Sequence, residues 1–156
     1  MALSVKRVTL WRADVDNRPG VLAQTLEPLA AAGGSLRVVM GYRLPQMHER
    51  AVIELHPVSG KRQTDAAQRA GLSAAPIPCL LIEGDDRPGL GAAMARALGD
   101  AGVNIAFLMA QVVGRRFSAL IGFDDETAID AGARAVKGAA RPARAAPRGR
   151  ARKSRR

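Results

Sequence analysis

The chain has 156 residues, of which 47% are apolar, yet it contains only one Trp, one Tyr and three Phe. This length allows one ordinary domain or two very small ones, with a core of Ala, Val, Leu and Ile. The net charge is +10, but eight basic residues and no acidic residue lie in residues 141–156, which leaves +2 over residues 1–140. Residues 1–140 are therefore nearly neutral, which excludes a basic surface over that part of the chain. Most of the excess positive charge lies in residues 141–156.

The first copy of a repeated unit begins with an apolar-rich segment, residues 5–14, which predicts a strand. Apolar residues at helical spacing after residue 20 predict a helix that ends at Gly33 and Gly34. Alternation of period two over residues 36–43 and 51–56 predicts an antiparallel hairpin. A second helix over residues 61–70 and a short last strand over residues 72–76 complete the unit.

The second copy repeats this order 69 residues later, where D-x-R-P-G recurs at Asp85 after its first appearance at Asp16. We expect a strand over residues 77–84, a helix ending at Gly102, a hairpin, and a helix over residues 126–137 capped by Asp124 or Asp125. The sequence then runs into a segment rich in Ala, Arg and Pro, so we expect this copy to lack a last strand.

These patterns predict an α+β fold, with two βαββα(β) units of ferredoxin-like order and antiparallel sheets. The expected boundaries are residues 1–75 for the first unit, 76–137 for the second, and 138–156 for a disordered basic tail.

The D-x-R-P-G turns have a chemistry of their own. Proline at the first helical position pre-sets φ, and the glycine beside it lets a ligand approach the backbone. Exposed N–H groups and the positive end of the helix dipole favour a carboxylate there. A simpler alternative is that the turn is only a good helix start.

A strand, then D-x-R-P-G, then a helix that ends in the run A-G-V-N-I, residues 101–105 of the second copy, closely resembles the ACT domain. The first copy departs from this pattern at Ser35, where the family has Asn. The resemblance covers about residues 5–137 and implies small regulatory modules that pair and bind amino acids between them. No catalytic domain is attached, so the chain resembles the small stand-alone proteins built of two such modules.

By this resemblance, each copy has ligand-binding candidates in the turn and at the start of the next strand. They are Asn17, Arg18, Pro19, Gly20, Val21, Leu22 and Ser35 in the first copy, and Asp86, Arg87, Pro88, Gly89, Leu90 and Asn104 in the second. The resemblance also implies a homodimer and an unidentified regulated protein as partners. Small residues near the turns hint at a small or apolar amino acid.

Catalysis is not expected. His48 and His56 have no cysteine or carboxylate cluster beside them, and the paired acids fit turns and helix starts. Cys79 cannot form an internal disulfide, has no zinc-ligand neighbours, and stands in an apolar segment that predicts burial. We therefore expect no catalytic residue, no metal and no cofactor. With no signal peptide in residues 1–10 and no apolar run long enough for a membrane span, we expect a cytoplasmic protein.

Two other functions stay open. The tail could bind nucleic acid weakly and without sequence preference, or be an inert solvated extension. Its candidate contacts are Arg148, Arg150, Arg152, Lys153, Arg155 and Arg156. A third reading is an oligomerisation module that pairs through sheet edges without any ligand.

Overall fold

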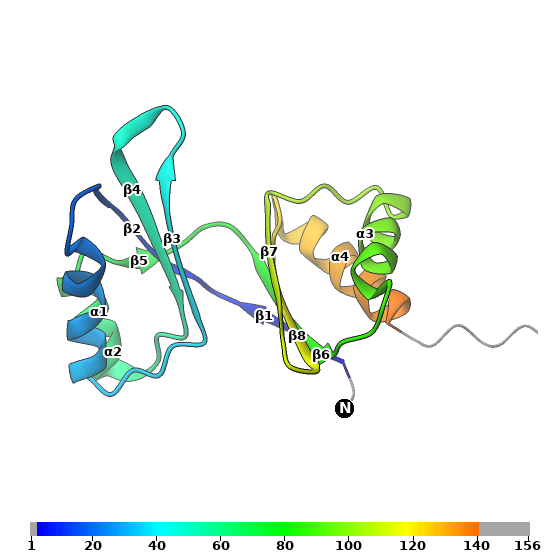
Figure 1. Cartoon of the computed structure of the whole chain (residues 1–156), viewed down its shortest axis with the longest axis horizontal. Helices are drawn as coiled ribbons and strands as arrows, with labels where there is room; N and C mark the ends of the chain where they lie inside the picture. Colours follow the sequence, from blue (N-terminus) through cyan, green and yellow to red (C-terminus); the bar gives the residue numbers. More distant parts are fainter. Residues whose placement is uncertain (1–2, 141–156) are drawn as a thin grey trace, which may run out of the picture.

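The computed structural model describes residues 3–140, which form two α+β units side by side (Figure 1). The first unit contains six elements in the expected order. They are β2 (Trp11–Asp16), α1 (Val21–Ala31), β3 (Val38–Leu44), β4 (Met47–His56), α2 (Gly60–Arg69) and β5 (Ser73–Ala74). Its antiparallel sheet has the strand order β3-β4-β2-β5. The predicted helices, hairpin and short last strand of this unit are confirmed.

The second unit repeats this series with β6 (Cys79–Asp85), α3 (Leu90–Asp100), β7 (Phe107–Val113), β8 (Arg116–Gly122) and α4 (Glu126–Ala139). Asp125 is the N-cap of α4, where its carboxylate accepts the Ala128 N–H at 2.7 Å. Both α1 and α3 are followed by a glycine in the left-handed region, with φ of 80° at Gly33 and 65° at Gly102. The predicted helix ends are therefore confirmed.

The strand expected over residues 5–14 is in fact two strands that serve different sheets. The first of them, β1 (Ser4–Val8), ends at Val8, and the second, β2, begins at Trp11. β1 pairs antiparallel with β6, with Val5 opposite Ile82, so the second sheet has the order β1-β6-β8-β7.

Within residues 3–140 no strand follows α4, as expected for the second copy, but its sheet has a fourth strand nevertheless. The strand comes from the other end of the sequence, and it covers the side of β6 that would otherwise be an unpaired edge. The boundary between the two units, placed between residues 75 and 76, stays a prediction. The pairing of β1 with β6 adds that β1 belongs to the sheet of the second unit.

The helices cover the two outer faces of the molecule, α1 and α2 on the first sheet and α3 and α4 on the second (Figure 1). Each helix pair buries its own core against its sheet. In the first unit this core includes Leu29, Ile53 and Leu55. In the second unit it includes Leu98 and Phe123 among others.

The faces of the two sheets that carry no helix meet in a third apolar cluster. It contains Val38 and Met40 of β3, and from the second unit it draws mainly on β6, β7 and β8, including Cys79, Leu81, Phe107, Met109 and Leu120. Arg37 adds an ion pair across the boundary, with its guanidinium 2.5 Å from a carboxylate oxygen of Glu83. The units are therefore packed together by apolar contacts as well as joined by the chain.

The α+β class and the antiparallel sheets are as predicted. Among the helices within residues 3–140, none combines the length and hydropathy needed to cross a bilayer.

Candidate functional site

Both D-x-R-P-G turns adopt the same backbone geometry at a junction of strand and helix. Gly20 and Gly89 are the N-cap residues of α1 and α3, with φ of 84° and 81°, and neither helix has a side-chain cap. In the described part of the chain, no heavy atom beyond the adjoining residues lies within 4 Å of a Cβ built at either glycine. The turns are therefore open to solvent, and their positive φ explains why glycine stands there.

The proline of each turn lies before the helix rather than in its first position. Pro19 and Pro88 each precede the N-cap glycine, and the helices begin at Val21 and Leu90. The expectation of a proline at the first helical position is wrong, because the left-handed glycine makes one more turn residue before the helix starts.

The turns are tied to the tips of their hairpins by hydrogen bonds to backbone carbonyls. The Asn17 N–H donates to the Glu49 carbonyl at 2.8 Å, and the Asn17 side-chain amide donates to the His48 carbonyl at 2.9 Å. In the second unit the Asp86 N–H donates to the Arg115 carbonyl at 2.8 Å. Each turn is thereby held in place by a different segment of its own unit.

The two turn arginines make internal contacts. Arg18 donates to the Gln24 side-chain oxygen at 2.7 Å, within the first turns of α1. Arg87 donates to the carbonyls of Ala139 and Ala140 at 3.3 and 3.4 Å, at the C-terminal end of α4. Both guanidinium groups therefore stabilise the turn and its surroundings in this structure.

Within one unit, the two halves of each predicted site lie at opposite ends of a helix. Ser35 and Asn104 follow the C-terminal ends of α1 and α3, and an 11-residue helix is about 16 Å long. Asn104 donates to Asp124 at 3.5 Å, the long limit of a hydrogen bond. The structure therefore does not bring Asn104 beside Gly89, although a groove joins the two regions.

This groove lies between α3 and the edge strand β7, and we call it the α3–β7 groove. It consists of two adjoining hollows with volumes of about 270 and 240 Å³. Asp86 lies at the end nearest the turn, and Asn104 lines the other end. Four residues line both hollows: Gly91, Met94, Ala110 and Ala119. Leu90, Leu98, Val103, Ile105, Leu108, Val112, Phe117 and Ile121 supply most of the remaining apolar wall.

The sequence predicted the two ends of the groove but not its walls. Of the predicted second-copy residues, Asp86, Leu90 and Asn104 line it, whereas Arg87, Pro88 and Gly89 do not, and none of the predicted first-copy residues does. Gly91 inside a helix was the available signal, because glycine is unfavourable there unless space is needed. Ala119 gave no signal, since a small residue in a strand has many explanations.

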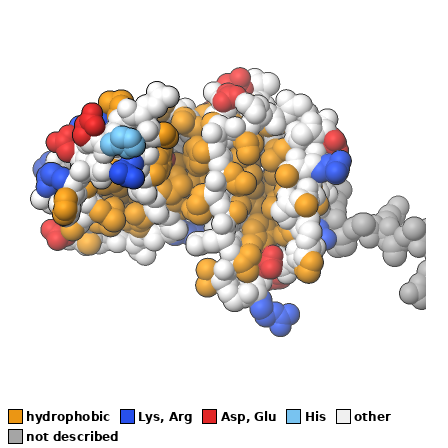
Figure 2. Space-filling view, turned by 45° about the horizontal axis from the view of Figure 1, so that its top comes forward, with side chains coloured by type: hydrophobic (Ala, Val, Ile, Leu, Met, Phe, Trp, Pro, Cys, Tyr) orange, Lys and Arg blue, Asp and Glu red, His pale blue; other side chains and the backbone are white. Residues whose placement is uncertain are grey.

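Strand β7 forms one edge of its sheet, and its apolar side chains are unusually exposed. Leu108 is 57% exposed, Val112 55% and Val113 70%, and hydrophobic side chains show on the surface of both units (Figure 2). An apolar edge strand is a surface on which another chain can pair.

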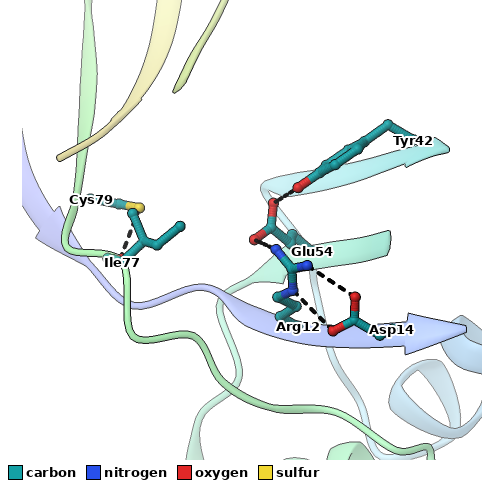
Figure 3. Close-up of polar contacts among 6 residues, drawn as sticks. All are labelled: Arg12, Asp14, Tyr42, Glu54, Ile77 and Cys79. Atoms are coloured by element: carbon teal, nitrogen blue, oxygen red, sulfur yellow. Dashed lines mark hydrogen bonds and ion pairs between the residues drawn. The ribbon is translucent and has the colours of Figure 1, made fainter. Parts of the chain in front are cut away.

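A polar network lies on the helix-free face of the first sheet (Figure 3). Glu54 is only 1% exposed; it accepts a hydrogen bond from the Tyr42 hydroxyl at 3.1 Å and lies 3.7 Å from the Arg12 guanidinium. Arg12 also donates to Asp14, and this hydrogen bond lowers the pKa of the Asp14 carboxyl. Burial, followed by the Glu54 charge, raises the pKa of Tyr42. Arg12 and Tyr42 therefore provide the buried Glu54 carboxylate with an ion pair and a hydrogen bond.

The predicted burial of Cys79 is confirmed, since it is fully buried in the cluster between the sheets. Burial first, and the Glu54 charge second, raise the pKa of its thiol to about 12. A thiol in this state is a poor nucleophile and a poor metal ligand at neutral pH.

The remaining candidate polar residues within residues 3–140 are histidines and acidic residues. This part of the chain contains no group of three or more His, Cys, Asp or Glu side chains placed to hold a metal ion. The His56 ring is hydrogen-bonded with the Thr9 carbonyl at 3.0 Å, a structural contact. The predicted nucleic-acid contacts at residues 148–156 lie outside the described residues.

Comparison with known proteins gives structural matches only. No family model matches the sequence, and no curated protein matches it. The ligand-free regulatory subunit of aspartate kinase from Thermus thermophilus is 19% identical, with a TM-score of 0.59, and the match covers 89% of this chain and 97% of that chain.

Two further solved structures agree with this match. The aspartokinase α and β subunits are 17% identical, with a TM-score of 0.60 and coverage of 89% of this chain and 97% of that chain. The protein BT0572 from Bacteroides thetaiotaomicron is 14% identical, with a TM-score of 0.66 and coverage of 81% and 87%. At these identities the similarity establishes the fold, so the chain has the tandem ACT-type fold that its two turns predicted.

Proposed function

We propose that this chain is a regulatory protein, not an enzyme, which binds a free amino acid and responds by changing its assembly with a partner. The observation that supports this proposal best is the open turn at Gly89 beside an apolar groove. The turn offers backbone N–H groups and a helix N-terminus that suit a carboxylate, and Asp86 offers a carboxylate to an ammonium group. The fold it shares with the aspartate kinase regulatory subunit is consistent with a regulatory role.

The partner proposed for assembly is a second copy of the chain. Within residues 3–140, strand β7 leaves one edge of its sheet unpaired, and Leu108, Val112 and Val113 are exposed along it. Pairing along β7 would satisfy this edge and cover the apolar side chains. A ligand in the neighbouring groove would stabilise or oppose that pairing, and a coupling of about 1 to 3 kcal/mol is enough for regulation.

The test is a thermal-shift screen of the full chain against the twenty amino acids at millimolar concentration. A ligand that binds the native state raises the melting temperature by mass action. We expect a selective rise with one or a few amino acids, accompanied by a change of mass in sedimentation. Absence of any rise would contradict amino-acid binding.

Asp86→Asn provides the site control, because it removes the proposed ammonium partner without changing size. Asp100→Asn is the matched variant, an exposed acid at the other end of α3. We expect Asp86→Asn to lose most of the thermal response and Asp100→Asn to keep it. Equal responses would remove Asp86 from the site.

A further inference from the structure

The two units differ at the positions that shape the α3–β7 groove. Gly91 lines both hollows, and a Cβ built on it meets no heavy atom within 4 Å. The residue 69 positions earlier is Leu22, which is 44% exposed on α1. At the next turn of the helix, Ala95 of the groove corresponds to Leu26, which packs against the core of the first unit.

The sheet under the groove shows an exchange of large and small residues. In the second unit Ile82 of β6 lies opposite Ala119 of β8, and in the first unit Ala13 of β2 lies opposite Ile53 of β4. All four side chains are buried on the helix-covered face. The large residue therefore stands beside the edge strand in the first unit and one strand further inward in the second. This exchange leaves space at the edge of the second sheet.

At one helix position the second unit has the larger residue, since Met94 of α3 corresponds to Thr25 of α1. Met94 is 7% exposed and forms part of the groove wall, where its flexible side chain can adapt to a ligand. Thr25 instead donates its hydroxyl to the Val21 carbonyl of its own helix at 2.9 Å.

From these differences we propose that the second unit is the ligand-binding unit, and that its groove takes the aliphatic side chain of an amino acid such as leucine, isoleucine, valine or methionine. This inference rests on the proposed amino-acid binding and specifies the unit and the ligand class. In the first unit the chain's own leucine and isoleucine side chains occupy the corresponding positions.

The lining of the groove favours an aliphatic side chain over a charged one. Among the described residues that line the hollow between α3 and the start of β7, none is charged, and only Asn104 has a side chain with hydrogen-bonding groups. Burying a charged side chain there would leave it without a partner, which is costly. Its volume of about 240 Å³ lies below the roughly 300 to 1,000 Å³ of pockets for drug-sized ligands, so a small molecule fits best.

The experiment is isothermal titration of the full-length protein with L-leucine, L-isoleucine, L-valine, L-methionine and L-lysine, before and after Gly91→Leu. This variant gives the second unit the residue of the first, and the open space at Gly91 allows the protein to fold. We expect at least one aliphatic amino acid to bind at least tenfold more tightly than lysine. We expect Gly91→Leu to weaken that binding at least tenfold.

Ala92→Leu is the matched control, because it adds the same side chain at the neighbouring exposed position of α3, which does not line the groove. We expect its affinity to stay within about twofold of the unmodified protein. Circular dichroism and melting temperature in the absence of ligand check that both variants are folded.

The outcomes separate this inference from the proposed function. If an amino acid binds and Gly91→Leu leaves its affinity unchanged, the groove is not the site, whereas amino-acid binding stands. A preference for lysine would overturn the aliphatic class. If no amino acid binds the unmodified protein, both proposals fail. If Gly91→Leu changes only the mass in sedimentation, a second copy covers the groove, and the inference is overturned.

Discussion

The two units share their order of elements and the geometry of their turns, yet each completes its sheet differently. The first unit uses β5, which has two residues and directly follows α2, whereas the second uses β1, which has five residues and precedes the entire first unit. In the sequence, the first unit thus lies between β1 and β6, which are neighbours in the second sheet. Repetition along a chain therefore conserves local geometry without making the two copies equivalent, and the variants below test that difference.

The largest effect is expected from removing residues 1–8. This deletion takes β1 away from β6 and removes Val5, which packs against the second core. We expect the second unit to lose more than about 3 kcal/mol of stability, because apolar burial and five paired positions disappear together. Urea unfolding followed by circular dichroism measures this loss.

The matched change in the first unit is Ser73→Gly with Ala74→Gly in β5. Only two positions of β5 pair with β2, so we expect a loss of about 1 to 2 kcal/mol. Similar losses in the two proteins would show that β1 and β5 contribute alike.

Next in size are the core substitutions Leu29→Ala and Leu98→Ala, at matching positions of α1 and α3. Both side chains are buried, so each change is expected to cost about 2 to 5 kcal/mol. Trp11, the only tryptophan, reports on the first unit by fluorescence. Because apolar contacts join the sheets, we expect Leu98→Ala to shift the transition seen by Trp11 as well. An unshifted Trp11 transition would show that the units unfold independently.

A smaller effect is expected from alkaline pH at the boundary between the units. The pKa of Cys79 rises from 9.0 to about 12 on folding, so the native state favours the neutral thiol. Its contribution to stability is complete below about pH 9 and is lost as the pH rises from about 9 towards 12. We expect Cys79→Ala to unfold more easily at pH 7 and to show a flatter loss of stability between pH 8.5 and 10.5. Equal slopes for both proteins would place the thiol outside the boundary cluster.

The smallest effect is expected from the ion pair between Arg37 and Glu83. Their side chains are 48% and 22% exposed, and such pairs usually contribute about 0 to 1 kcal/mol. A double-mutant cycle with Arg37→Ala and Glu83→Ala is expected to give a coupling below 1 kcal/mol that decreases with added salt. A coupling well above this value would make the pair a main connection between the units.

Much of the fold could be predicted because its signals are local. The D-x-R-P-G turns, the glycines after α1 and α3, and the cap at Asp125 each depend on a few adjacent residues. The fourth strand of the second sheet could not be predicted, because residues 4–8 look like the beginning of β2 and only their pairing with β6 shows otherwise. The same holds for the α3–β7 groove. Its polar ends, Asp86 and Asn104, belong to sequence motifs and could be predicted, whereas the apolar residues of its walls belong to no motif.

The sequence by itself determined the repeated unit, the two open turns and the α+β class, since backbone conformation at glycine and the periodicity of apolar residues act over short distances. Only the tertiary structure decided which strand completes each sheet and which side chains shape the α3–β7 groove. The exchange of Ile82 and Ala119 for Ala13 and Ile53 shows the physical reason. Both pairs have the same composition and the same strand periodicity, and space at the sheet edge depends on which strand the larger side chain occupies.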